Sequence, residues 1–239
     1  MDLASNFEKV RERIGAACAR AKRVESEVTL VAVSKSQPPE AITELANAGQ
    51  LIFAENRVQE AKAKIPLCSG RLQWHMIGHL QSNKCRDAAA LFQMVQSVDS
   101  LALAEELDKA AEKQSKTMPI LLEVNVAGEN TKFGFKPAAV LANLDALNAL
   151  KRLEIHGLMT IAPYTSDLET VRPIFRQLRE LKAKCETALG APLPHLSMGM
   201  SGDYEVAIEE GATIVRIGTA LFGPRQYAKA KLRNEAEPE

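Results

Sequence analysis

Short apolar runs alternate with amphipathic stretches along the chain, and this alternation predicts its fold. Each of eight apolar runs of strand length is followed by a stretch whose apolar positions recur every three or four residues, which is typical of a helix. The predicted strands are residues 28–34, 51–56, 72–78, 91–98, 118–127, 153–162, 194–201 and 213–223. A further amphipathic helix, with apolar positions from Phe7 to Ala21, precedes the first strand.

Strict alternation of strand and helix predicts parallel strands joined by right-handed crossovers. Eight such units in a chain of 239 residues favour a closed (β/α)8 TIM barrel over an open sheet. No linker rich in Gly, Ser or Pro divides the chain. We therefore expect an α/β protein with one barrel domain over residues 1–230, an extra N-terminal helix, and a polar C-terminal tail over residues 231–239.

Composition excludes several classes of function. Thirty basic and thirty acidic residues cancel, so no overall field recruits nucleic acid or an anionic membrane. No apolar stretch approaches a membrane span, and residues 1–15 carry charge where a signal peptide needs an apolar run. The four cysteines form no CxxC pair, and no His, Asp or Glu set has metal-ligand spacing. We expect a cytoplasmic protein that binds neither nucleic acid, membrane nor metal.

Lys35 follows the first apolar run and, by alternation, shares a face with Val31 and Val33. Partial desolvation there would lower its pKa and favour the neutral amine, the form that attacks carbonyl groups. A lysine that simply reaches water gives the same local pattern. A barrel favours the first interpretation, because its active site lies where the C-terminal ends of all the strands meet.

Polar and small residues stand at the other strand ends as well. They are Asn56, His79, Asp99, Asn125, Met159, Ser197–Ser201 and Gly218-Thr219. Each has a simpler alternative: His79 could be a solvated loop histidine, the two asparagines could cap strand ends, and Met159 could be a core residue.

The loops after the last two strands have the composition of an anion site. The segment SMGMSGD (197–203) precedes a predicted helix, where free backbone N–H groups and the Ser201 hydroxyl would bind an anion. Gly218 allows close backbone approach and Thr219 offers a hydroxyl. Barrel enzymes commonly hold phosphate at these two loops.

Arg216 alternates with Val215 and Ile217, so it is expected to face the barrel interior. A buried guanidinium needs an acceptor. It could therefore belong to the site, or form a structural ion pair with Glu123 or Glu55.

Seven segments of the chain resemble, in order, the pyridoxal phosphate homeostasis proteins. They are VAVSKSQP, FAENRVQEA, WHMIGHLQSNK, VNVAGENTKFGF, HGLMTIAP, LSMGMSGDYEVAI and VRIGTALFG, and the resemblance covers about residues 5 to 227. The resemblance implies a barrel like the N-terminal domain of alanine racemase, with pyridoxal 5′-phosphate (PLP) bound covalently as a Schiff base to Lys35. It also implies that Ser201, Gly218 and Thr219 hold the phosphate and that Arg216 faces the pyridine nitrogen. The implied ring neighbours are Asn56, His79, Met159 and Met200.

What the resemblance implies about activity is a PLP carrier or buffer without catalytic turnover. An arginine cation disfavours protonation of the pyridine nitrogen and so weakens the ring as an electron sink. Racemisation needs two acid/base groups, and this chain is expected to lack the second domain from which alanine racemase takes its tyrosine. The expected partners are PLP and PLP-dependent apoenzymes as acceptors, and the expected state is a monomer. A PLP-dependent amino-acid racemase and a Schiff-base class I aldolase are the alternatives.

Overall fold

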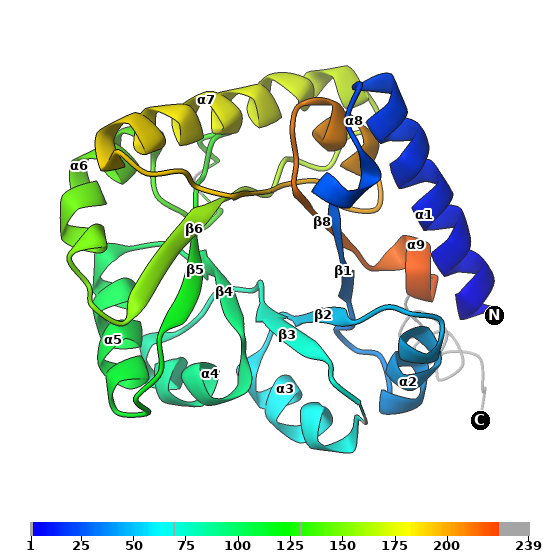
Figure 1. Ribbon diagram of the computed structural model, residues 1–239, viewed down its shortest axis with the longest axis horizontal. Coiled ribbons are helices and arrows are strands. Elements are labelled where there is room, and N and C mark those ends of the chain that lie inside the picture. The colour runs from blue at the N-terminus through cyan, green and yellow to red at the C-terminus, as the bar shows by residue number, and fades with distance from the viewer. Residues whose placement is uncertain (1, 69, 130, 225–239) are drawn as a thin grey trace, which may run out of the picture.

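The computed structural model describes residues 2–68, 70–129 and 131–224, so the polar tail expected over residues 231–239 lies outside the described residues. Within the described part, eight parallel strands form a closed barrel in sequence order, as predicted (Figure 1). The strands are β1 (Thr29–Val33), β2 (Ile52–Glu55), β3 (Gln73–Met76), β4 (Met94–Val98), β5 (Met118–Glu123), β6 (Leu153–Met159), β7 (His195–Ser197) and β8 (Ile214–Ile217).

Helices surround the barrel and follow each strand along the chain (Figure 1). The α-helices are α1 (Leu3–Arg20), α2 (Pro39–Asn47), α3 (Val58–Lys64), α4 (Cys85–Leu91), α5 (Leu101–Glu112), α6 (Pro137–Asn148), α7 (Arg172–Leu189), α8 (Tyr204–Glu209) and α9 (Thr219–Phe222). Short 3-10 helices are η1 (Glu25–Glu27), η2 (Ile65–Leu67), η3 (Ser82–Lys84) and η4 (Leu168–Thr170). None of the helices within the described residues is both long and apolar enough to cross a membrane.

The prediction of a last strand over residues 213–223 was wrong in its second half. β8 ends at Ile217, and residues Thr219–Phe222 form the helix α9 instead. A short apolar run fits a strand or a helix equally well, so the pattern alone could not place this boundary. The strands predicted at 91–98, 118–127, 153–162 and 194–201 are likewise longer than β4, β5, β6 and β7, because apolar residues continue past the strand ends.

Alternation along the strands creates two separate apolar clusters. The larger one lies between the strands and the surrounding helices. The smaller one fills the inside of the barrel, with Val33, Ala54, Leu121 and Ile214 among its members. Side chains two positions beyond these inner residues face the same way. The side chains two positions after Val33, Ala54 and Ile214 are Lys35, Asn56 and Arg216, and they therefore lie at the mouth of the barrel.

The extra N-terminal helix covers the outer side of the barrel near β1 and β8. α1 lies beside α8 and α9 (Figure 1), and its buried face includes Phe7, Val10 and Ile14. Arg13 and Arg20 form exposed ion pairs with residues of α8. Exposed pairs contribute little to stability, so the apolar face holds α1 in place.

Candidate functional site

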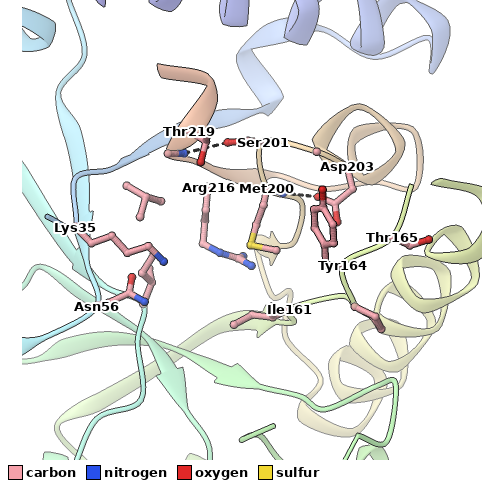
Figure 2. A pocket seen from close by; sticks show the side chains of 15 residues that line it. Lys35, Asn56, Ile161, Tyr164, Thr165, Met200, Ser201, Asp203, Arg216 and Thr219 are labelled. Carbon is pink, nitrogen blue, oxygen red and sulfur yellow. Dashed lines mark hydrogen bonds between the residues drawn. The ribbon is translucent and has the colours of Figure 1, made fainter. Parts of the chain in front are cut away.

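A cavity of about 380 Å³ opens at the C-terminal mouth of the barrel. It brings together seven of the nine predicted site residues, from segments far apart in the sequence. They are Lys35, Asn56, Met200, Ser201, Arg216, Gly218 and Thr219. Figure 2 shows Lys35 and Arg216 reaching into the same space, which follows from the pairing of β1 with β8, where Val31 is in register with Arg216.

The structure places the two other predicted residues outside the lining of this cavity. Met159 is fully buried in the inner apolar cluster, and Ile161, two residues further along, lines the cavity instead. His79 lies in an adjoining cavity, where its ring stacks on Phe133 with 3.6 Å between centroids and its Nδ1 lies 2.8 Å from Asp99 Oδ2.

The backbone before Lys35 is fixed by a buried polar network. The Ser34 hydroxyl donates to Glu55 Oε1 at 2.7 Å, and Lys64 Nζ donates to the Ser34 carbonyl oxygen and to Glu55 Oε1, each at 2.8 Å. Glu55 and Lys64 are only 0% and 7% exposed. Burial raises the pKa of Glu55, whereas Lys64 and Ser34 oppose the shift. The network links the end of β1 to β2 and α3.

The backbone after Lys35 is fixed by Glu60 of α3. The Ser36 N–H donates to Glu60 Oε1 at 2.5 Å, and Lys64 Nζ donates to the same oxygen at 2.7 Å. Ser36 has a φ of 62°, a left-handed conformation that is uncommon for a residue other than glycine. Lys35 therefore stands between two anchored serines, and its side chain starts from a well-defined position.

Arg216 is 3% exposed and is held by a chain of hydrogen bonds across the inside of the barrel. It donates from one terminal nitrogen to Ser197 Oγ at 2.6 Å and from the other to the Thr160 carbonyl oxygen at 2.8 Å. The Ser197 hydroxyl donates to Gln96 Oε1, and Gln96 Nε2 lies 2.9 Å from His75 Nδ1. His75 is buried and its pKa is lowered to about 4, so its ring is neutral and accepts from Gln96.

The alternative of an Arg216 ion pair with Glu55 was wrong, because Glu55 pairs with Lys64. Glu123 forms no ion pair with Arg216 within the described residues, although its charge and that of Asp203 favour the guanidinium cation. Burial lowers the pKa of Arg216 to about 10. The side chain is therefore a cation at neutral pH, and it lines the mouth cavity as a fixed positive charge.

The other end of the cavity contains hydroxyl and backbone N–H groups. Ser201 Oγ accepts from the N–H groups of Gly218 and Ala220 at 3.3 and 3.2 Å. Figure 2 shows Ser201 beside Thr219. The Thr219 side chain lies beside them and is exposed. The predicted anion site is thus a cluster of groups from the β7 and β8 loops, and an anion there would compete with Ser201 for the N–H groups.

Asp203 lines the cavity and was not among the predicted site residues. Asp203 is buried, and its Oδ1 accepts from the Met200 N–H at 2.6 Å, which fixes the loop that carries Met200 and Ser201. Burial raises the pKa of Asp203, whereas the bond from Met200 and the charge of Arg216 oppose the shift. Asp is frequent in turns, so its place at the end of the small-residue segment 197–203 is the sequence feature that could have indicated this role.

Comparison with known proteins identifies the family. The family described as the alanine racemase N-terminal domain matches residues 3–226. A pyridoxal phosphate homeostasis protein of Aquifex aeolicus (strain VF5) is 46% identical over 228 residues, which cover 95% of this chain and 100% of that protein. The chain belongs to the pyridoxal phosphate homeostasis protein family.

Solved structures agree with this family. PipY of Synechococcus elongatus PCC7942, determined with PLP bound, is 41% identical, has a TM-score of 0.79, and is matched over 90% of this chain and 100% of that one. Alanine racemase of Clostridium difficile 630 is 15% identical with a TM-score of 0.71, over 94% of this chain and 57% of that one. The latter likeness shows the fold alone.

Proposed function

We propose that the chain binds PLP in the mouth cavity, with the aldehyde carbon attached covalently to Lys35 Nζ, and that it acts as a PLP carrier or buffer. The observation that carries the proposal is one cavity lined by a primary amine, a buried guanidinium and a hydroxyl with backbone N–H groups. The amine can bond to the aldehyde, the guanidinium can donate to the pyridine nitrogen, and the hydroxyl and N–H groups can bind the phosphate. Family membership and the PLP-bound relative support the same assignment.

The residues present fit the cofactor. A cavity of about 380 Å³ falls within the usual range of small-molecule sites, about 300–1,000 Å³. The lining includes the buried cation Arg216 and the Ser201 hydroxyl beside the Gly218 N–H group, which suit a pyridine nitrogen and a phosphate. In this assignment Ser201, Gly218 and Thr219 hold the phosphate, and Arg216 faces the pyridine nitrogen.

Bound PLP would supply an electrophilic aldehyde that condenses with primary amines. Arg216 keeps its proton at neutral pH, so it would donate to the pyridine nitrogen and would disfavour the protonated ring that promotes carbanion chemistry. The chain's residues therefore bind and orient the cofactor without activating it for turnover. This is the chemistry of storage and transfer, in which an acceptor's amine replaces Lys35.

The partners we propose are PLP and the PLP-dependent apoenzymes that would accept it. We further propose a monomer located in the cytoplasm that binds no nucleic acid. All four cysteines are unpaired thiols, in keeping with a reducing compartment. Among the described residues, no cluster of three or more His, Cys, Asp or Glu side chains could hold a metal ion.

Racemisation is the competing activity, because Tyr164 on the loop after β6 lies at the rim of the cavity (Figure 2). Its side chain is fully exposed, so no packing holds the phenol over one face of a bound substrate. Deuterium exchange at the α-carbon of alanine separates the two activities. Exchange at catalytic rates under saturating protein would reject the carrier function.

Absorbance spectra of the purified protein with PLP test the proposal. We expect a visible band of bound PLP in the wild type, its complete loss in Lys35→Ala, and no change in the control Lys109→Ala, whose lysine is exposed on α5. A visible band that persists in Lys35→Ala would refute the covalent assignment. A colourless protein that borohydride traps only in the presence of a sugar phosphate would indicate an aldolase instead.

A further inference from the structure

A second cavity of about 280 Å³ adjoins the mouth cavity and shares the lining residues Asn56, Ile77 and Ile161 with it. Glu123, His79, Lys132 and Phe133 are among its other lining residues. Figure 2 shows Asn56 beside Lys35. A molecule in the second cavity would therefore be close to the Lys35 site.

Two acceptors without partners line this second cavity. The Glu123 side chain is 6% exposed and its carboxylate makes no hydrogen bond or ion pair within the described residues. The Oδ1 atom of Asn56 is buried and also has no partner in that part of the chain. Leaving such groups unpaired is costly, and more so for a charged group. Asn56 Oδ1 therefore lacks a donor, and the nearly buried Glu123 carboxylate lacks a paired cation among the described residues. Both groups favour a donor from outside the chain.

The neighbouring charged groups already have partners. Asp99 is paired with His79, Lys132 with Glu129, and Arg216 donates to Ser197 and to the Thr160 carbonyl oxygen. In contrast to Asp99 and Glu129, the Glu123 carboxylate is not paired with a cation among the described residues. A ligand with several N–H donors and a positive charge satisfies both Glu123 and Asn56.

We propose that the second cavity binds the ammonium group of an alkyl primary amine, with Glu123 as its counter-ion and Asn56 Oδ1 as a second acceptor. Because the described residues that line this cavity include no unpaired cation to hold a carboxylate, it favours a lysine side chain over a free amino acid. This inference rests on the proposed function and deepens it: the ligand is the lysine of an acceptor protein.

Glu123 would also accept a proton from the bound ammonium. The N–H bond breaks, the electron pair stays on nitrogen, and the proton forms an O–H bond on Glu123, giving a neutral amine and a neutral carboxylic acid. Burial and the nearby charge of Asp99 raise the pKa of Glu123 to about 7, while Arg216 opposes the shift. The neutral amine is the form that can replace Lys35.

The test measures binding of n-butylamine, which mimics a lysine side chain, by calorimetry at pH 8 to Lys35→Ala protein without PLP. We expect binding, at least about tenfold weaker in Lys35→Ala/Glu123→Gln, since the second substitution removes the charged acceptor of the ammonium group. The control substitution Glu154→Gln removes an exposed carboxylate and should leave the affinity for n-butylamine unchanged.

Alanine should bind at least about tenfold more weakly than n-butylamine, since its carboxylate finds no unpaired cation among the described lining residues. Equal affinities for the Glu123→Gln and Glu154→Gln proteins would overturn the proposal.

A second readout covers the case in which the Glu123→Gln protein does not fold. Carbon-13 NMR titration of Glu123 in Lys35→Ala protein should give a lower pKa in saturating n-butylamine than without it, because the cation favours the carboxylate. An unchanged pKa would refute the site. Since the protein carries neither Lys35 nor PLP, these results are independent of the spectra that test PLP attachment.

Discussion

The carboxyl group of Glu123 makes the stability of the ligand-free protein depend on pH. Its pKa rises from 4.5 to about 7 on folding. Between these values the folded state binds a proton that the unfolded state has lost, so the free energy of unfolding falls as pH rises through this range. Above pH 7 the charged side chain costs about 3 kcal/mol, from the 1.36 kcal/mol that each pKa unit represents.

Glu123→Gln should therefore stabilise the protein at pH 8, by up to about 3 kcal/mol, and change its stability little at pH 4. Urea denaturation of both proteins at the two pH values measures the difference. An equal difference at both values would mean that Glu123 does not titrate as the structure indicates. Glu154→Gln, at an exposed carboxylate, serves as the control and should show no such pH dependence.

At the scale of single residues, the sequence predicted the groups that stand at strand ends but not their surroundings. Lys35 and Arg216 were identified because a charge beside an apolar run is unusual. Glu123 was seen only as a possible partner of Arg216. Its lack of a partner among the described residues depends on distances across the barrel between β5 and β8, and no pattern along the chain encodes these distances.

The junction of β1 with α3 is the element that fixes Lys35. Lys64 Nζ is the common partner of the Ser34 carbonyl oxygen, Glu55 and Glu60. Removing one member of a buried ion pair leaves the other charge uncompensated, which typically costs about 3–5 kcal/mol. This junction therefore determines both the stability of the first unit and the position of the site lysine.

Lys64→Met should destabilise the protein by about 3–5 kcal/mol and reduce its loading with PLP. The double substitution Lys64→Met/Glu55→Gln should recover most of the stability, because it removes both charges of the buried Lys64–Glu55 pair. Urea denaturation of Lys64→Met, of Glu55→Gln and of the double variant measures this coupling. Additive effects would show that Lys64 and Glu55 do not stabilise each other.

At the scale of elements, the chain order and the type of nearly every strand and helix could be predicted, because apolar runs and amphipathic stretches have different periods. The position at which β8 ends could not be predicted. The segment after Gly218 is short and apolar, a pattern that fits a strand as well as a helix. In the folded barrel Thr219–Phe222 forms the helix α9. That boundary matters for the site, because the N–H groups of Gly218 and Ala220 surround Ser201 there.

At the scale of the whole molecule, barrel closure turns scattered strand ends into one site. β1 pairs with β8, so a lysine near the start of the chain and an arginine near its end line the same cavity. The sequence predicted this convergence from the count of strand–helix units alone. It could not predict that the adjoining space between β2 and β5 would form a second cavity, since cavity shape depends on side-chain packing throughout the mouth.

Reductive trapping tests most directly whether PLP is attached to Lys35. The protein is loaded with PLP, reduced with borohydride, digested, and mapped by mass spectrometry. A single pyridoxyl adduct on Lys35 is the predicted result, because the Lys35 amine lines the mouth cavity together with Ser201 and Gly218. An adduct on another lysine, or no adduct after loading, would contradict attachment at Lys35.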